Sequence, residues 1–137
     1  MNYLFDTNII SDLVSSKPNK NVAKWVESVP QNTLYLSVLT LGEIRSGIER
    51  REDGKRKNQL IAWLEHQLPQ WFAGRILLVD HQVADRWGYL VGGTKRTLPM
   101  IDSLLAATAL TNNLVMVTRN VKDFDMQGLE VINPFLD

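Results

Sequence analysis

The sequence contains no cysteine, so neither a disulfide framework nor a thiolate metal site is available, and any bound metal must use oxygen or imidazole ligands. Histidine is scarce, with only His66 and His81. We interpret both as structural or surface residues, because His66 lies within an amphipathic helical pattern and His81 begins another helical pattern. These absences leave the carboxylates as the main candidates for metal ligands.

The chain also lacks net charge, because fifteen basic residues balance fifteen acidic ones. Overall charge therefore gives no argument for nucleic-acid binding, and the distribution of charge matters more. Basic residues crowd one central stretch, which holds Arg45, Arg50, Arg51, Lys55, Arg56 and Lys57. Such a stretch is either a solvated helix face or a surface that attracts a polyanion.

Long apolar runs are absent as well, since no stretch approaches the roughly 18 residues that span a bilayer. The N-terminus carries an acid-bearing strand candidate, residues 3–6, and not the basic and apolar regions of a secretion signal. We therefore expect a cytoplasmic protein with no membrane association. Its 137 residues, 45% of them hydrophobic, predict a single domain over residues 1–137.

Short apolar runs of strand length alternate with helical patterns along the whole chain. The predicted strands cover residues 3–5, 34–36, 76–79, 115–117 and 131–132. Strands separated by helices require crossover connections, and crossovers produce a mainly parallel sheet covered by helices on both faces. The predicted class is α/β, with a central sheet of about five strands.

Polar residues mark where several helices are expected to begin. Asn8, Asn21 and Ser37 precede helical patterns and are predicted N-caps. Residues 58–68 have the spacing of an amphipathic helix, and Pro69 is expected to close or kink it. A further helix is predicted over residues 83–91, ending near Gly92.

In open parallel sheets, ligands bind beyond the carboxyl ends of the strands, and acidic residues occur at such places here. Asp6 directly follows the first strand, where it either serves chemistry or caps the next helix; we favour chemistry because Asn8 is available as a cap. After the strand at residues 115–117, either Asp123 or Asp125 can join a cluster, or the stretch is an Asx-rich turn. Thr118 and Asn120 can donate hydrogen bonds there.

Two further acids lie in apolar helical patterns. Glu43 needs a partner if it is buried, and otherwise it is a surface residue paired with a nearby arginine. Gly42 and Gly47 flank it and predict close approach of another element or a ligand. Asp102 opens a nearly all-apolar helix, so it faces either the helix dipole alone or an interior site.

These motifs together resemble the PIN domain, and in particular the VapC toxins, including the FitB-like branch. The resemblance runs end to end and rests on Leu4-Phe5-Asp6-Thr7-Asn8, Ser37-Val38-Leu39-Thr40-Leu41-Gly42-Glu43-Ile44, Pro99-Met100-Ile101-Asp102-Ser103-Leu104-Leu105-Ala106-Ala107-Thr108-Ala109, Val117-Thr118-Arg119-Asn120-Val121-Lys122-Asp123-Phe124 and Asn133-Pro134-Phe135. It implies a PIN-like three-layer sandwich. It also implies a toxin of a type II toxin–antitoxin pair that hydrolyses RNA.

The resemblance also implies which residues form the active site. Asp6, Glu43 and Asp102 correspond to the three main acids, with Mg²⁺, or Mn²⁺ in its place, on Asp6 and Asp102. The family often has an acid at the position of Asn120, so here either Asp123 serves as the fourth acid or the site binds its second ion weakly. The expected supporting residues are Asn8, Thr118 and Asn120, and the basic residues expected to steer RNA are Arg45, Arg50, Arg51 and Arg96.

The resemblance further implies a homodimer and a cognate VapB-like antitoxin, which together can form a larger assembly. A peptide of that antitoxin would occupy the acidic groove, where an arginine among the carboxylates makes electrostatic sense. Two rival functions use the same acids. One is a non-catalytic module that binds a metal or a peptide. The other is a phosphoaspartyl-type phosphatase, whose motif has a second acid at the position of Asn8 in this chain.

Overall fold

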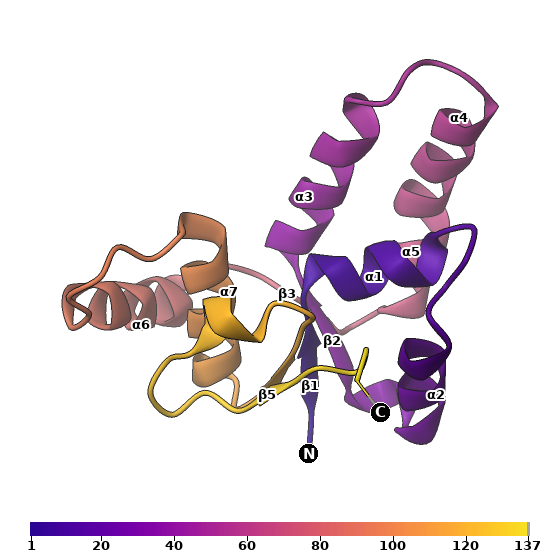
Figure 1. The fold of residues 1–137 in the computed structure, drawn as a ribbon. Helices are drawn as coiled ribbons and strands as arrows, with labels where there is room; N and C mark the ends of the chain where they lie inside the picture. The colour runs from indigo at the N-terminus through magenta and orange to yellow at the C-terminus, as the bar shows by residue number, and fades with distance from the viewer. Residues whose placement is uncertain (137) are drawn as a thin grey trace.

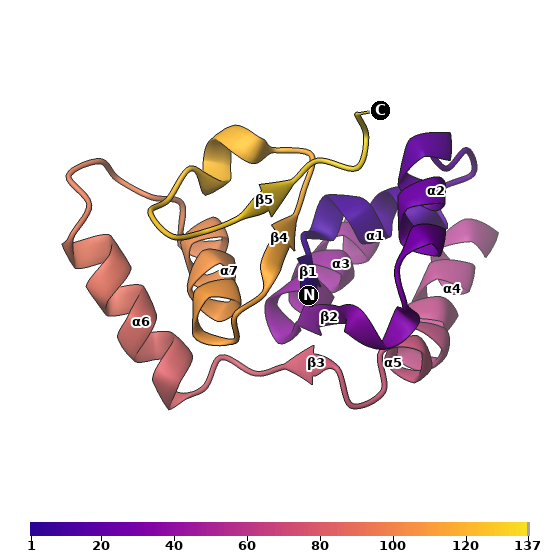
Figure 2. The ribbon, with the colours of Figure 1, turned by 90° about the horizontal axis from the view of Figure 1, so that it is seen from below.

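The computed structural model describes residues 1–136, and its centre is a five-stranded sheet in the order β3-β2-β1-β4-β5 (Figure 1 and Figure 2). The strands are β1 (Tyr3–Phe5), β2 (Leu34–Ser37), β3 (Ile76–Leu77), β4 (Val115–Val117) and β5 (Val131–Ile132). Every neighbouring pair is parallel. The predicted α/β class and the five-stranded parallel sheet are confirmed.

Helices cover both faces of this sheet. They are α1 (Thr7–Val14), α2 (Lys20–Ser28), α3 (Val38–Glu49), α4 (Lys55–Ala62), α5 (Leu68–Trp71), α6 (His81–Gly92) and α7 (Met100–Thr111). Shorter segments are the 3-10 helices η1 (Gln31–Thr33) and η3 (Val121–Phe124) and the π-helical segment η2 (Trp63–Gln67). In Figure 2, α6 and α7 lie on one side of the sheet and α1 to α5 on the other. None of the helices within residues 1–136 has the length and apolar character needed to cross a bilayer.

The sheet separates two hydrophobic cores because successive residues of a strand point to opposite faces. Phe5 of β1 packs with the α1 to α5 layer, where it meets Ile9, whereas its neighbour Leu4 packs with Leu105 of α7. All four side chains are fully buried. The two cores fix α1 and α3 on one side and α7 on the other, and these are the helices that carry the acids.

The observed N-caps of the helices differ in part from those predicted from the sequence. Ser37 caps α3 as expected, with its hydroxyl accepting a backbone N–H. Asp6, not Asn8, caps α1, and Asn19, not Asn21, caps α2. Each helix therefore begins earlier than expected, because an Asp or Asn upstream already satisfies the first free N–H groups.

Two other boundaries also differ from the prediction. Pro69 does not close the helix, because the backbone stays helical on both sides of it, from η2 into α5. The preceding segment η2 is π-helical, and such a segment changes the helix register. Strand β3 ends at Leu77, and Leu78 and Val79 are exposed beyond it.

The strand order creates a switch point between β1 and β4. From β1 the chain moves outward to β2 and β3, and it then returns to β4 on the other side of β1. The connections at the carboxyl ends of these two strands diverge there, which is where open α/β sheets bind ligands. Asp6 follows β1 and Thr118 follows β4, so the topology brings these two residues together.

Candidate active site

Asp6 is the centre of a buried hydrogen-bond network at the switch point. Only 6% of the residue is exposed. One carboxylate oxygen, Oδ1, accepts the backbone N–H of Thr7 at 2.7 Å, and Oδ2 accepts the hydroxyl of Thr118 at 2.7 Å. The Asn8 amide lies 3.3 Å from the same Oδ2. Asp6 therefore both caps α1 and stands in the predicted site, so the two interpretations of this residue are compatible.

The pKa of Asp6 is raised above its ordinary value. Burial is the largest cause, because it penalises the charged form. Hydrogen bonds from Thr118 and Thr7 oppose this rise, whereas the negative charges of Glu43 and Asp123 add to it. Asp6 is therefore electrostatically coupled to two acids that lie far from it in the sequence.

Glu43 reaches the site from α3 through a contact that the sequence analysis did not foresee. The Thr7 hydroxyl donates a hydrogen bond to Glu43 Oε1 at 2.5 Å, and the Thr40 hydroxyl lies 3.5 Å from that of Thr7. Thr7 thus contacts Asp6 through its backbone and Glu43 through its side chain. Its place between Asp6 and Asn8 is a signal for function, but the sequence does not show that its hydroxyl crosses to α3.

Asp102 approaches from the opposite face of the sheet, in the first turn of α7. Its pKa is raised to about 6 by burial first, and then by the charges of Asp6, Asp123 and Glu43. All of these causes act in the same direction. The four acids proposed from the sequence thus influence one another, although they come from four separate segments.

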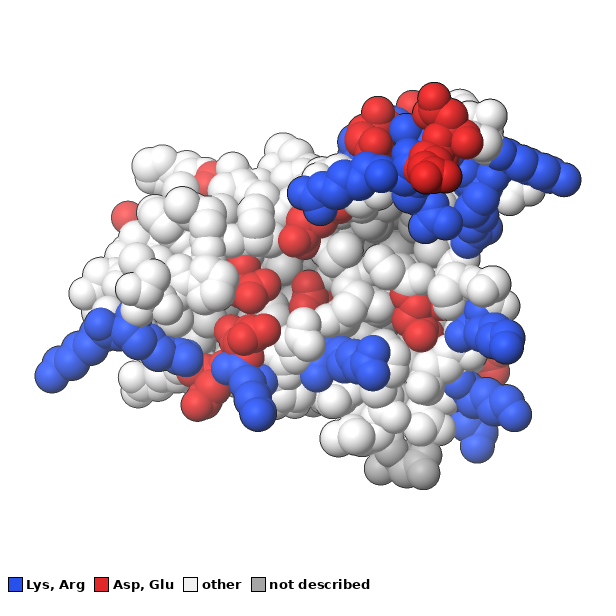
Figure 3. Space-filling model, turned by 45° about the horizontal axis from the view of Figure 1, so that its top comes forward, with Lys and Arg blue, Asp and Glu red and all other residues white. Residues whose placement is uncertain are grey.

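The acids gather in a hollow on one face of the molecule. Figure 3 shows acidic side chains around the centre of this face and basic side chains at its edges, most densely over the turn between α3 and α4. Asp123 joins the cluster from η3. Asp125 does not act on Asp6 or Asp102 and instead borders a different hollow with Arg96. Of the two late acids left open by the sequence, the structure brings Asp123 to the site.

The four carboxylates do not form a ready-made chelate. Within residues 1–136, no three acidic or histidine side chains converge closely enough to hold one ion as they stand. Across the same residues, no Lys or Arg forms an ion pair with any of the four. Uncompensated carboxylates repel one another, and a hard cation is the natural partner for such an oxygen-only set. The site suits a divalent ion in its chemistry, and small side-chain rotations would have to complete its geometry.

The supporting residues bind one another as well as Asp6. The Asn8 amide nitrogen lies 3.4 Å from the Thr118 hydroxyl, and the Asn8 amide oxygen accepts the Arg119 backbone N–H at 3.3 Å. The backbone N–H of Asn120 donates to the Thr118 hydroxyl at 3.0 Å. Asn120 therefore contacts this network through its main chain, and its side chain makes no cap bond to η3.

The four arginines predicted to steer RNA lie in different surroundings. Arg45 is paired with Glu49 at 3.8 Å and with Glu65 at 2.7 Å. Arg96 donates to the backbone carbonyl of Asp125 at 2.8 Å and borders the hollow beside α6. Arg50 is exposed at the end of α3. Arg51 alone of the four lines a cavity that Glu43 also lines.

The flanking glycines do not serve the close packing that the sequence suggested. Within the described chain, a Cβ built on Gly42 or Gly47 would meet no atom within 4 Å. No other helix or strand therefore needs a glycine at either position. Gly47 borders the same cavity as Glu43, which leaves space for a ligand beside that acid.

An open parallel sheet with clustered carboxylates at its switch point defines a class of α/β protein suited to metal-assisted hydrolysis. Comparison with known proteins identifies the family within this class. The PIN domain model matches residues 3–126, and the chain belongs to the PIN domain family. The family resemblance noted in the sequence is therefore confirmed.

Individual relatives match nearly the whole chain. Toxin FitB of Neisseria gonorrhoeae is 35% identical, over 98% of this chain and 99% of its own. The VapC ribonuclease Y4jK of Sinorhizobium fredii is 33% identical, over 96% of each chain. In three dimensions the chain is similar to the crystal structure of FitAcB from N. gonorrhoeae, with a TM-score of 0.89 and 33% identity over 98% of this chain and 99% of that one.

Proposed function

We propose that this chain is the toxin of a type II toxin–antitoxin pair and acts as a metal-dependent endoribonuclease. The observation that carries the proposal is the cluster of Asp6, Glu43, Asp102 and Asp123 at the sheet's switch point, where each acid carries no compensating Lys or Arg within residues 1–136. The names of relatives matched over nearly their full length, a FitB toxin and a VapC ribonuclease, support it.

PIN-domain ribonucleases generally use a divalent metal, and we propose Mg²⁺ here, with Mn²⁺ as an effective substitute. Asp6 and Asp102 are the proposed ligands. When bound, such an ion neutralises charge on a phosphodiester and lowers the pKa of a coordinated water. Asp6 is held in place by Thr118 and the Thr7 backbone, so one ligand is already oriented without the ion.

The remaining residues have proposed roles that follow from their positions. Glu43 and Asp123 add negative charge near the proposed ligands, which strengthens the attraction for a cation. Thr118 and Asn8 fix the Asp6 carboxylate, and Asn120 supports Thr118 through its backbone. An acidic centre cannot attract RNA by itself, so the basic side chains at the edge of the hollow must do so.

We further propose that the chain forms one domain over residues 1–137, works in the cytoplasm and pairs with itself as a homodimer. A VapB-like antitoxin is its proposed inhibitor. Solved neighbours over nearly the full chain are described as FitAcB and as VapBC-1, with TM-scores of 0.89 and 0.76. A peptide that places a cationic side chain among the four carboxylates would compete with the metal for the same charge.

A cleavage assay with matched variants tests the proposal. Purified protein is incubated with total bacterial RNA in Mg²⁺, in Mn²⁺ and in chelator, and the new RNA ends are mapped. The Asp6→Asn variant should lose at least about 100-fold in rate, because even the loss of a residue behind a metal ligand costs about 10- to 100-fold. Asp80→Asn is the control, since Asn also caps helices and Asp80 only caps α6.

The result separates the proposal from its two rivals. Cleavage that needs the metal, that Asp6→Asn abolishes and that Asp80→Asn keeps supports a ribonuclease. Metal binding without cleavage would indicate a non-catalytic binding module. Release of inorganic phosphate from a phosphate monoester, with intact RNA, would indicate a phosphoaspartyl-type phosphatase.

A further inference from the structure

A cavity of about 280 Å³ begins at the acidic centre and opens between α1, α3 and α4. Its lining includes Thr7 and Glu43 at the acidic end and the basic side chains of Arg51 and Arg56. Gly47, which lies on α3 one turn after Glu43, leaves the cavity wall free of a side chain there. The cavity therefore connects Glu43, one of the four clustered acids, to two cationic side chains.

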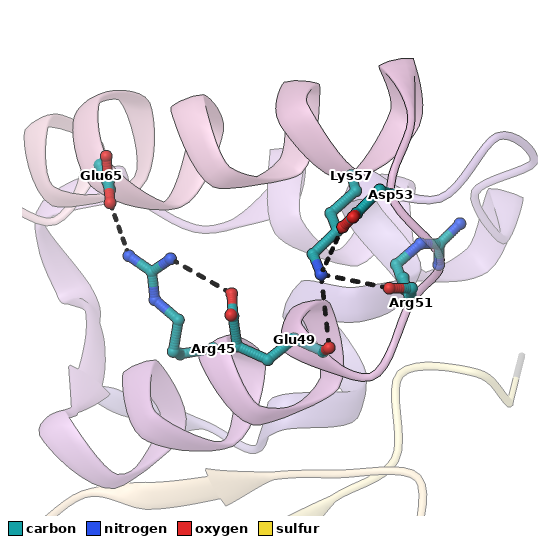
Figure 4. Close-up of polar contacts among 6 residues, drawn as sticks. All are labelled: Arg45, Glu49, Arg51, Asp53, Lys57 and Glu65. Carbon is teal, nitrogen blue, oxygen red and sulfur yellow. Dashed lines mark hydrogen bonds and ion pairs between the residues drawn. The ribbon is translucent and has the colours of Figure 1, made fainter.

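Arg51 is the cationic side chain most available for a ligand in this cavity. Its backbone carbonyl accepts a hydrogen bond from Lys57 at 3.2 Å, which holds the turn between α3 and α4 in place. Within residues 1–136 its guanidinium forms no ion pair, and Figure 4 shows it pointing away from Lys57 and Asp53. The backbone is thus anchored, while the charged group is exposed to solvent.

Arg56 is positioned by a single contact. One guanidinium nitrogen, Nη2, donates to the backbone carbonyl of Val14 across the cavity at 2.8 Å. An arginine carries five donor N–H groups, so most of its donors are left for another acceptor. The contact holds the planar group in a defined position, which suits recognition of a phosphate.

Two other basic side chains near the α3–α4 turn, Arg45 and Lys57, already form ion pairs or hydrogen bonds. Arg45 lies between Glu49 and Glu65, and the Lys57 ammonium contacts Asp53 as well as two backbone carbonyls (Figure 4). The Lys57 side chain is only 13% exposed. These two side chains stabilise the hairpin of α3 and α4, and this leaves Arg51 and Arg56 as the cations that face the cavity.

The remaining wall of the cavity is apolar and aromatic. Ile48, Leu60 and the half-buried Trp63 contribute to it. Sites for single-stranded nucleic acid combine cationic side chains for the backbone with an aromatic or apolar surface for the bases. The cavity offers both, and Glu43 of the acidic cluster forms part of its wall.

We infer that this cavity is the substrate subsite for single-stranded RNA beside the scissile bond, with Arg51 and Arg56 binding backbone phosphates and Trp63 contacting a base. The inference rests on the proposed function, because it assigns the strand that the acids would cut. It selects Arg51 from the four arginines predicted from the sequence, and it adds Arg56, which that prediction omitted.

The test measures RNA affinity without cleavage. A short fluorescein-labelled single-stranded RNA of mixed sequence is titrated with the Asp6→Asn protein in chelator at several salt concentrations, and anisotropy gives the dissociation constant. Arg51→Ala and Arg56→Ala are added singly to this background. Arg86→Ala is the matched control, because Arg86 is an exposed arginine on α6 that does not line the cavity.

Each phosphate contact in a single strand contributes about 0.7 to the slope of log affinity against log salt. Arg51→Ala and Arg56→Ala should therefore each weaken binding several-fold and make that slope shallower by about 0.7, while Arg86→Ala changes neither. Equal losses in all three variants would show only a long-range effect of net charge and would overturn the inference. Unchanged affinity in both cavity variants would overturn it too.

The proposed function fails on a different result. If the Asp6→Asn protein has no affinity for RNA and the wild type cleaves none, the ribonuclease proposal is wrong. If RNA is bound and cleaved but the two arginines make no difference, only the subsite is wrong.

Discussion

Replacing Asp102 with asparagine removes a negative charge that destabilises the folded chain. The pKa of Asp102 rises from its ordinary 3.8 to about 6, with burial as the main cause and the charges of Asp6, Asp123 and Glu43 adding to it. Such a rise corresponds to about 3 kcal/mol at most. Because the carboxylate is partly open to solvent, which screens its interactions, we expect about 1 to 2 kcal/mol.

The direction of the effect follows from proton binding. Between pH 3.8 and about 6 the folded chain keeps the Asp102 proton that the unfolded chain has lost. The free energy of unfolding must therefore fall as pH rises through this window, and the full cost is present above it. Asp102→Asn should remove this cost. The free energy of unfolding of the variant should therefore exceed that of the wild type by about 1 to 2 kcal/mol at about pH 8, and by little at about pH 4.

Urea denaturation of wild type and Asp102→Asn in chelator, across this pH range, measures the difference directly. Asp80→Asn serves again as the control, because it removes an acid from a helix N-terminus that is not part of the cluster. A stability difference that stays constant from about pH 4 to about pH 8 would refute the reasoning. It would mean that neither burial nor the charges of the other acids raise the pKa of Asp102 in the folded chain.

Two further outcomes are expected. Thr7→Val should lose the hydrogen bond to Glu43 and require about 10-fold more metal for half-maximal cleavage, since a hydrogen bond to a charged group contributes about 1.5 to 3 kcal/mol. Thr7→Ser should restore the wild-type requirement, and Thr111→Val should have no such effect, because the buried Thr111 hydroxyl finds no partner within residues 1–136. In calorimetry, Mn²⁺ should raise the melting temperature of the wild type, and chelator should reverse the shift. The shift should be smaller in Asp6→Asn. An equal shift in that variant would mean that the ion binds elsewhere.

The sheet and the gathering of acids could be predicted because both depend on regular features of the sequence. Strand-length apolar runs alternating with helical patterns favour a parallel sheet, and parallel strands align their carboxyl ends. Asp6 could therefore be placed from β1 alone. Asp102 and Glu43 lie in apolar helices, for which the sequence left open an interior site or a role at the surface or at the helix dipole.

The helix caps and the arginines that are available to a ligand were harder to predict from the sequence. Each depends on which of several nearby side chains makes a given hydrogen bond or ion pair. Asp6 and Asn8 can both cap α1, and only the turn after β1 decides that Asp6 does. The chain likewise has many exposed arginines, and the sequence does not show that Arg45 is occupied by Glu49 and Glu65 while Arg51 is left without an acidic partner among the described residues.

The contact between Thr7 and Glu43 was missed for a related reason. The two residues are 36 positions apart, and the bond forms only because α1 and α3 follow adjacent strands and pack together. A motif shows that a threonine stands beside an important acid. It does not show where the hydroxyl points, which is set by the packing of two helices.

Asp6 and Asp102 reach the site from opposite faces of one sheet, and we propose that they bind the same ion. Anomalous diffraction from crystals soaked in Mn²⁺ tests this claim directly. We predict a peak between the two carboxylates, within the about 2.0 to 2.2 Å that small divalent ions keep from oxygen ligands. No peak at that position in a crystal that shows Mn²⁺ bound elsewhere would contradict the account.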